Sequence, residues 1–356
     1  MELDIARDAE LSDCNTMRVQ ARTGALVRIH STEQLRALSE RWVGDFDPGT
    51  VRLLGQGSNS IPCDWPGAVV QLRLGGIEVL DEGERLVRVR IGAGEDWPSL
   101  VRTALERGWY GLENLAMIPG SVGAAPVQNI GAYGVELSDR LAAVEVFDWS
   151  DRTRRLIPAD ELQLGYRTSR LRGAQGVWVL AIHLDLLRCP DVVTDYPSLL
   201  EELERRSGGG SAARPTPEAV FEAVCALRGR KLPDWRRHPN AGSFFHNPEV
   251  DRAEAERLAA AFPDLPRWPV PEGWRVPAGW LLERCGWRGR RSGPLEFWRD
   301  HALTLVNHGG AASSSEIIEF ARQAMDAVQK TFGLALTVEP MLWEAERLNL
   351  KRPQTQ

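Results

Sequence analysis

The sequence predicts a fold that mixes helices and strands, of the α+β or α/β class. Short runs with alternating apolar residues, typical of strands, occur between segments whose apolar residues recur at helical spacing. The clearest strand lies at residues 86–94 (LVRVRIGAG), where Val87, Val89 and Ile91 share one face. With 356 residues and 43% hydrophobic content, the chain is long enough for two or three domains, each with its own core.

The first half of the chain supplies its elements in a regular order. Ser31 and Gln34 form a capping box that predicts a helix bearing Leu35, Leu38 and Trp42. Pro98 begins a second helix, which Gly108 ends. Strands are predicted at 51–55 (VRLLG), 68–74 (AVVQLRL), 142–149 (AAVEVFDW) and 177–186 (VWVLAIHLDL).

The second half begins after a Gly-rich and Pro-rich segment at 207–217 (SGGGSAARPTP), which is typical of a linker. Thr216 and Pro217 then predict the start of a helix. Ser313 and Glu316 form a further capping box before a long amphipathic helix. The last predicted strand is 334–340 (LALTVEP).

The overall composition limits the classes of function. A formal net charge of −6 argues against coating nucleic acid or a membrane surface. The five cysteines are odd in number and show no CxxC spacing, so we expect neither a disulfide framework nor a metal site. The acidic first residues predict no signal peptide, and no apolar run is long enough to span a membrane. We therefore expect a soluble, cytoplasmic protein, and a monomer.

Two glycine-rich segments indicate a binding site for phosphate groups. The first, residues 53–60 (LLGQGSNS), directly follows a strand, and the second, residues 119–134 (PGSVGAAPVQNIGAYG), contains no charged residue. Backbone N–H groups without bulky side chains can approach an anion closely. Neither segment is a Rossmann GxGxxG, since Ser60 stands where the third glycine would be, and no GKS or GKT is present. Each segment alone is more often a plain turn; together they favour a dinucleotide held by a fold other than Rossmann.

Seven motifs occur in a fixed order along the chain: LGQGSN, GLENLAMIPGSVGAAPVQNIGAYGVEL, GYR, RKLPD, NAGSFFHNP, AGWLLERCG and LTVEP. In these motifs the sequence resembles the UDP-N-acetylenolpyruvoylglucosamine reductases, also called UDP-N-acetylmuramate dehydrogenases, from about Asn15 to Met341. These are flavoenzymes of bacterial cell-wall synthesis. Tyr196 resembles the marker of the subclass in which a tyrosine-bearing loop folds over the substrate.

The resemblance implies an α+β architecture with FAD bound in a p-cresol methylhydroxylase-type fold. Residues 1–84 would form the first FAD-binding subdomain, to which residues 333–350 return. Residues 85–207 would form the second subdomain and residues 208–215 a linker. Residues 216–332 would form a substrate-binding domain.

The same resemblance implies which residues contact FAD. The first glycine-rich segment would surround the pyrophosphate, and the second would pass beside the flavin and pyrophosphate, where bulky side chains would collide. Tyr133 is also consistent with a half-buried structural aromatic. The implied FAD-binding residues are Gly55, Gly57, Ser58, Asn59, Pro119, Gly120, Ser121, Gly123, Gln128, Gly131 and Tyr133.

The implied reaction has two halves. NADPH reduces FAD, and the reduced flavin passes a hydride to the enolpyruvyl double bond, which leaves negative charge on an enolate. Ser243 matches the family's proton donor. Arg167 matches the partner of the substrate carboxylate and enolate, and Glu339 matches an acid that polarises or positions the enolate. A carboxylate beside an enolate is repulsive, so we expect Glu339 to have a raised pKa or a charged partner.

Substrate-binding positions and departures from the family pattern complete the prediction. Implied substrate contacts are Tyr166, Tyr196, Lys231, Asn247 and His301, although Lys231 is equally consistent with a solvated helix end. Because GxGxxG is absent, we expect NADPH to visit the substrate pocket. The unusual segment 286–303 and the 13 tryptophans leave a paralogue acting on another nucleotide sugar open. A silent flavin-binding or nucleotide-sugar-binding protein is a third alternative, which the presence of all three predicted catalytic residues disfavours.

Overall fold

The computed structural model describes residues 3–41, 50–208 and 214–343. Contacts divide the chain into two compact units. Unit 1 comprises residues 1–9, 23–56 and 65–229, and unit 2 comprises residues 10–22, 57–64 and 230–356. Each unit is therefore assembled from segments that are far apart in the sequence.

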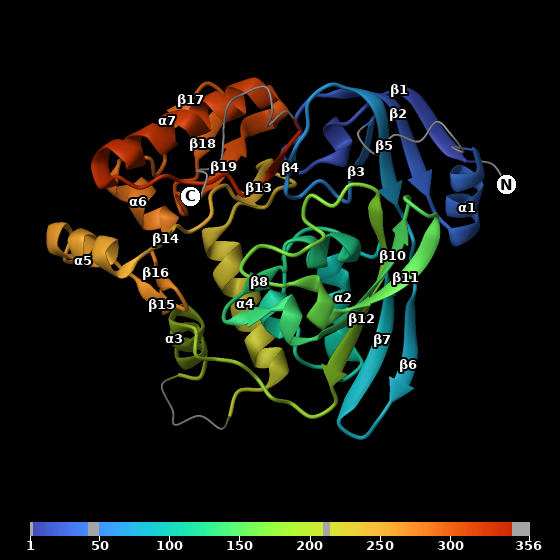
Figure 1. Ribbon diagram of the computed structural model, residues 1–356. Coiled ribbons are helices and arrows are strands. Elements are labelled where there is room, and N and C mark those ends of the chain that lie inside the picture. The colour runs from blue at the N-terminus through green and yellow to red at the C-terminus, as the bar shows by residue number, and fades with distance from the viewer. Residues whose placement is uncertain (1–2, 42–49, 209–213, 344–356) are drawn as a thin grey trace. The chain divides into compact units, whose positions relative to one another are not determined.

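Unit 1 contains two large sheets, besides a two-stranded hairpin described below (Figure 1). The four-stranded sheet has the order β1 (Asp4–Glu10), β2 (Arg22–Ile29), β5 (Trp65–Leu72), β3 (Val51–Leu53). In it β5 runs parallel to both β2 and β3. The five-stranded sheet is antiparallel, with the order β11 (Thr153–Pro158), β10 (Leu141–Asp148), β12 (Val177–Leu187), β7 (Leu86–Gly92), β6 (Ile77–Glu82).

The two faces of the five-stranded sheet pack against different partners. On β7, Val87, Val89 and Ile91 are fully buried on one face, as the alternation predicted. This face forms the main core with α2 (Trp97–Glu106), α3 (Pro197–Arg206) and α4 (Pro217–Lys231). The opposite face packs on the four-stranded sheet and on α1 (Thr32–Arg41) through a second core, in which Phe147, Trp149 and Trp178 lie against the α1 side chains.

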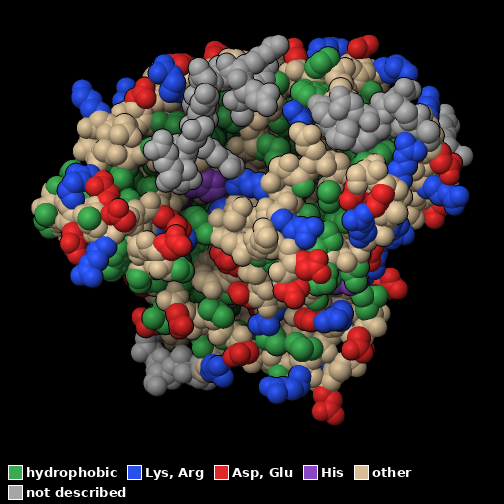
Figure 2. All heavy atoms as spheres, in the orientation of Figure 1, with side chains coloured by type: hydrophobic (Ala, Val, Ile, Leu, Met, Phe, Trp, Pro, Cys, Tyr) green, Lys and Arg blue, Asp and Glu red, His purple; other side chains and the backbone are tan. Residues whose placement is uncertain are grey.

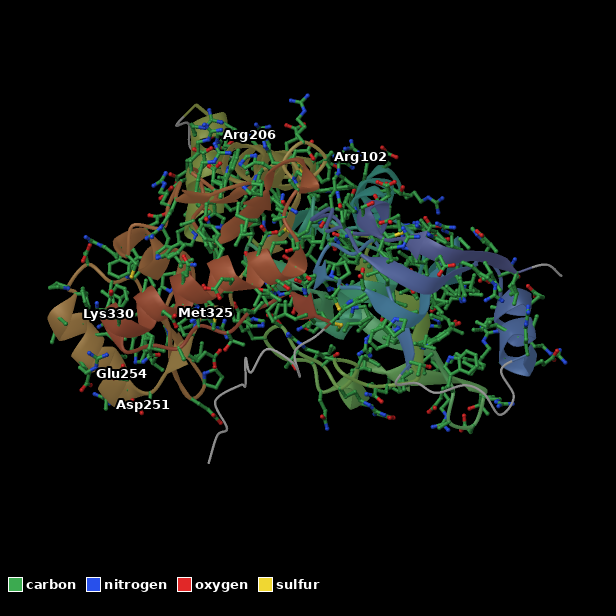
Figure 3. All side chains as sticks on the ribbon, turned by 90° about the horizontal axis from the view of Figure 1, so that it is seen from above. Arg102, Arg206, Asp251, Glu254, Met325 and Lys330 are labelled. Carbon is green, nitrogen blue, oxygen red and sulfur yellow. The ribbon has the colours of Figure 1, made fainter. Side chains whose placement is uncertain are left out.

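Helix α4 packs in unit 1, whereas the sequence suggested that it begins a separate C-terminal domain. Val220 and Val224 have no exposed surface and belong to the main core of unit 1. Arg206 of α3 forms an ion pair of 2.6 Å with Glu222, and the guanidinium of Arg102 on α2 lies 5.5 Å from the Phe221 ring; Figure 3 labels both arginines. Of the expected linker, residues 209–213 lie outside the described residues.

Up to residue 343, where the described part of the chain ends, unit 2 contains smaller sheets and the helices α5 (Arg252–Ala261), α6 (Ala278–Arg284) and α7 (Ser314–Phe332). One sheet has the order β13 (Asn240–Ser243), β19 (Thr304–Asn307), β18 (Leu295–Phe297), β17 (Arg291–Ser292). A second has the order β14 (Glu249–Val250), β16 (Gly273–Arg275), β15 (Trp268–Val270), and β4 (Ser60–Ile61) pairs in parallel with β20 (Met341–Leu342).

Helix starts in unit 2 follow the capping rules. Ser313 and Glu316 form the expected reciprocal capping box before α7, which confirms that prediction. The Asp251 carboxylate accepts a hydrogen bond of 2.8 Å from the Glu254 amide at the start of α5 (Figure 3). In unit 1, Ser31 likewise accepts from the Gln34 amide before α1, while Trp42 lies outside the described residues.

The strand predicted at residues 334–340 is wrong. This segment makes one isolated bridge, between Val338 and Phe245, and joins no ladder. Its alternation arises because Leu334 and Leu336 are buried in the core that α7 forms. An extended segment packed on a helix shows the same period of two as a strand, since the period reflects burial and not pairing.

Candidate active site

The uncharged segment 119–134 is fixed to the rest of unit 1 by its backbone. Gly120 has a positive φ of 139°, which favours glycine, and the amides of Val122 and Gly123 donate to the carbonyls of Glu95 and Ala93 at 2.8 and 2.9 Å. A 3₁₀ helix, Val122–Val127, and a two-residue hairpin of β8 (Gly131–Ala132) and β9 (Val135–Glu136) follow. The segment is therefore ordered by local hydrogen bonds.

Close approach of protein atoms explains several of its glycines. A Cβ at Gly123 would lie 2.6 Å from the Cβ of Ala93, and one at Gly131 would lie 3.1 Å from a guanidinium nitrogen of Arg167. A Cβ at Gly55 would overlap the Ser121 hydroxyl. The sequence predicts that bulky side chains here would collide with a bound cofactor. At Gly123, contact with Ala93 within the protein is a further reason for glycine.

Asn129 holds the middle of this segment, although the sequence did not single it out. The side chain has no exposed surface, and its Nδ2 donates to the Glu136 carboxylate at 2.8 Å and to Ser138 Oγ and Gly165 O at 3.3 Å. Its Oδ1 accepts from the Ser138 amide at 3.0 Å. The residue is in a left-handed conformation, φ 44°, which asparagine tolerates better than most residues. Asn129 therefore links the segment to two neighbouring loops.

Unit 1 contains two pairs of predicted site residues whose side chains meet. The Arg167 guanidinium donates to the Gly131 carbonyl at 2.6 Å and lies 5.2 Å from the Tyr166 ring. The rings of Tyr133 and Tyr196 meet edge to face at 5.4 Å. Arg167 and Tyr133 both have positive φ, at 53° and 49°. Such strain is more frequent at functional sites than elsewhere.

Unit 2 brings Ser243 and Glu339 onto hydrogen-bonded backbone segments. Ser243 ends β13 after Gly242, whose φ is 74°, and the Glu339 amide donates to the Phe244 carbonyl at 3.0 Å. The Glu339 side chain is buried, and its carboxylate lies 3.8 Å from Nδ1 of His246. His246, when protonated, would be a charged partner of the kind predicted for Glu339. The sequence placed His246 inside the NAGSFFHNP motif, but no local signal indicated the pairing.

The predicted substrate contacts of unit 2 have structural roles or are exposed. Asn247 Oδ1 accepts from the Ala278 amide at 2.9 Å, at the first residue of α6. Lys231 is exposed at the end of α4. His301 is half-buried in a turn, where its carbonyl accepts from the Thr304 amide at 3.0 Å.

Several backbone N–H groups of the predicted phosphate loop have no acceptor within the part of the chain that the structure describes. The amide N–H groups of Gly55, Gln56, Gly57 and Ser58 donate no hydrogen bond to any residue that the structure describes. Gly57 is buried with φ 65°, and a Cβ there would overlap the Cys14 carbonyl. Gly57 is buried and the other three residues are half-buried, and a buried N–H group without an acceptor is rare. Such backbone donors are of the kind that bind an anion. The Asn59 carbonyl accepts from the Met341 amide at 2.9 Å and fixes the end of the loop.

Two family models match the chain. Residues 23–156 match an FAD binding domain, and residues 234–343 match the C-terminal domain of UDP-N-acetylenolpyruvoylglucosamine reductase. The match to an FAD binding domain defines the class of the protein, a flavoprotein. No helix in the described ranges is long and apolar enough to cross a membrane.

Individual relatives narrow the class. A UDP-N-acetylenolpyruvoylglucosamine reductase of Azoarcus sp. is 40% identical over 349 residues, which is 95% of this chain and 98% of the relative. One from Alcanivorax borkumensis is 40% identical, over 94% of this chain and 95% of its own. The crystal structure of the Thermus caldophilus reductase is similar with a TM-score of 0.65 and 25% identity, covering 96% of this chain and 99% of that one. The chain belongs to the UDP-N-acetylenolpyruvoylglucosamine reductase family.

Proposed function

We propose that this protein is an FAD-dependent, NADPH-consuming enzyme that reduces the enolpyruvyl group of UDP-N-acetylenolpyruvoylglucosamine to UDP-N-acetylmuramate, a peptidoglycan precursor. Family membership over nearly the whole chain supports the substrate and the cofactors. One observation on the structure carries the proposal furthest. Ser243 and Glu339 lie on directly hydrogen-bonded segments, so a proton donor and an acid are held together.

FAD, when bound, accepts a hydride from NADPH and supplies it to the enolpyruvyl double bond. We propose that the unpaired N–H groups of residues 55–58 bind its pyrophosphate and that residues 119–134 border the cofactor. The Arg167 guanidinium would bind the substrate carboxylate with two parallel donors, which a lysine cannot reproduce. Its hydrogen bond to the Gly131 carbonyl fixes the orientation of the side chain.

Ser243 would donate the proton that completes the reduction. A serine hydroxyl is a weak acid, so it acts only on a strongly basic carbon in a site that excludes water. The adjacent Phe244 and Phe245 are fully buried, and they fix the backbone on which the hydroxyl stands. Glu339, held by its amide hydrogen bond and paired with His246, would position the enolate without adding an uncompensated negative charge.

Substrate binding and cellular context follow from the same proposal. Tyr166, Tyr196, Lys231, Asn247 and His301 are the proposed substrate contacts, and the nucleotide-sugar substrate and NADPH favour the cytoplasm. We infer no nucleic-acid or membrane partner and a monomeric state. Positive and negative side chains are interspersed over the described part of the face in Figure 2, which agrees with the net charge of −6.

The domain proposal is also supported by the sheets of unit 1. The four-stranded sheet lies within residues 4–72 and the five-stranded sheet within residues 77–187. These ranges agree in outline with FAD-binding subdomains at 1–84 and 85–207. The third proposed domain, 216–332, would exclude α4 from its core, because α4 packs in unit 1.

Separated half-reactions test the function. Under anaerobic conditions NADPH should bleach the flavin absorbance of the holoenzyme, and UDP-N-acetylenolpyruvoylglucosamine should restore it. In Ser243→Ala, bleaching should stay within about twofold of wild type while restoration slows by about 10²-fold or more, since general acid catalysis contributes that much. Ser292→Ala, an exposed serine of β17, is the control. Equal loss of both steps in Ser243→Ala would contradict the role of Ser243.

A further inference from the structure

Arg228 lies on the face of α4 that packs against unit 1. It follows Val220 and Val224 at four-residue intervals, so the three side chains share one side of the helix. Val220 and Val224 are fully buried. The guanidinium of Arg228 is therefore directed along the packed side of α4 and not toward the solvent side.

The Arg228 guanidinium has no partner among the residues that the structure describes. Its Nε is buried and donates no hydrogen bond, and no ion pair of the guanidinium is present within those residues. Arginine keeps its charge under all ordinary conditions. A buried N–H group without an acceptor is rare and costs about 1–3 kcal/mol. The buried Nε of Arg228 is such a group, and a bound ligand would supply the acceptor that the described residues do not.

The charged and titratable neighbours of Arg228 indicate that its guanidinium lies near predicted site residues of unit 1. Burial lowers the pKa of Arg228, the ionised forms of Tyr133 and Cys225 would raise it, and the positive charge of Arg167 lowers it further. Arg228 is therefore electrostatically coupled to two of the predicted site residues. Two cations beside the uncharged segment 119–134 repel each other unless an anion joins them.

We propose that Arg228 is an anion-binding residue of the active site, whose guanidinium receives an anionic oxygen of a bound ligand in place of an absent protein carboxylate. The inference rests on the proposed function, which supplies two ligands with such oxygens. One is FAD, and the other is the UDP-sugar with its diphosphate and carboxylate. Both sources share the same chemistry, and binding experiments distinguish them.

The test compares Arg228→Gln, Arg228→Lys and wild type in two binding assays. FAD affinity is measured by quenching of flavin fluorescence on titration of the apoprotein. UDP affinity is measured on the holoenzyme from the change in flavin absorbance. Arg230→Gln, an exposed residue two positions along α4, is the control. A lost charge-assisted hydrogen bond should weaken the affected ligand by about tenfold or more in Arg228→Gln, and by less in Arg228→Lys.

The affinities that Arg228→Gln loses show which ligand supplies the anionic oxygen and whether the inference holds. Weaker FAD binding identifies the cofactor as the anion, and weaker UDP binding identifies the diphosphate of the substrate. In urea denaturation of the apoprotein, Arg228→Gln should be as stable as wild type or more stable, because a buried Nε without an acceptor is removed. Unchanged affinity for both ligands would overturn the inference, and so would loss of stability or of folding in Arg228→Gln.

Failure of the proposed function has a different signature. Wild-type protein would then bind no FAD, or its reduced flavin would not be reoxidised by UDP-N-acetylenolpyruvoylglucosamine. Failure of the Arg228 inference alone leaves the wild-type half-reactions intact and makes Arg228→Gln indistinguishable from Arg230→Gln.

Discussion

Replacing Asn129 with alanine should loosen the segment that we propose to border the flavin. The change removes the charge-assisted bond to Glu136, worth about 2 kcal/mol, and the bond from the Ser138 amide, worth about 1 kcal/mol. The two longer bonds, both 3.3 Å, add about 1 kcal/mol together. Asn129→Ala should therefore lower the free energy of unfolding by about 4 kcal/mol, and weaken FAD binding because the segment is no longer held in place.

Urea denaturation of the apoprotein and titration of it with FAD measure the two effects. Ser138→Ala is the matched control, since it removes only the hydroxyl acceptor at 3.3 Å and should lower the free energy of unfolding by less than about 1 kcal/mol. If Asn129→Ala unfolds within 1 kcal/mol of wild type, or binds FAD equally well, the assignment of Asn129 as the residue that fixes this segment is refuted.

Two further predictions concern unit 1. Burial raises the pKa of Glu145, but hydrogen bonds from Arg90 and His183 outweigh this and lower it to about 2. The resulting stabilisation, at most about 3 kcal/mol, is complete above pH 5 and is lost as the pH falls toward 2. The difference in urea midpoint between wild type and Glu145→Gln should therefore be largest at pH 7 and smaller at pH 3. A difference that does not change with pH would contradict the stabilising role of the ionised Glu145 carboxylate. Gly123→Val should lower the melting temperature because its side chain would collide with Ala93, by an amount equivalent to about 1–3 kcal/mol. Ala124→Ser, a change at the exposed neighbouring residue, should leave the melting temperature unchanged. Equal melting temperatures for the two variants would show that the collision with Ala93 does not occur.

Local patterns were sufficient for much of the fold. Alternation identified β7 because its Val87, Val89 and Ile91 side chains share one buried face of a sheet. The capping box at Ser313 identified the start of α7 because its hydrogen bonds join residues only three apart. Such signals are readable from sequence because both partners lie in the same short window.

Features that depend on distant partners were not predictable. The segment 334–340 resembles a strand, yet it is buried by α7 and the strand ladder is absent. Helix α4 follows a linker-like sequence but packs in unit 1, because Val220 and Val224 belong to a core whose members extend back to Val87. The pairing of His246 with Glu339 joins two motifs that only the tertiary structure brings together.

Only part of the candidate site was predictable, because some of its features also depend on residues distant in the sequence. The resemblance to a family indicated Arg167, Tyr133, Ser243 and Glu339, and the structure groups the first two in unit 1 and the last two in unit 2. Arg228 carries no motif of its own, since its importance arises from the absence of a partner. An absent interaction leaves no trace in a sequence, and it becomes visible only when every neighbouring side chain has been placed.

Unit 2 is closed by strands and hydrogen bonds from opposite ends of the polypeptide. Asn307 donates to the carbonyl of Met17, 290 residues away, and β4 pairs with β20. During synthesis, residues 10–22 and 57–64 therefore cannot form these contacts until nearly the entire chain has left the ribosome. A fragment that begins at Arg230 would lack these two segments and would expose the apolar surface that they cover, so it should aggregate unless residues 10–22 and 57–64 are supplied as separate peptides.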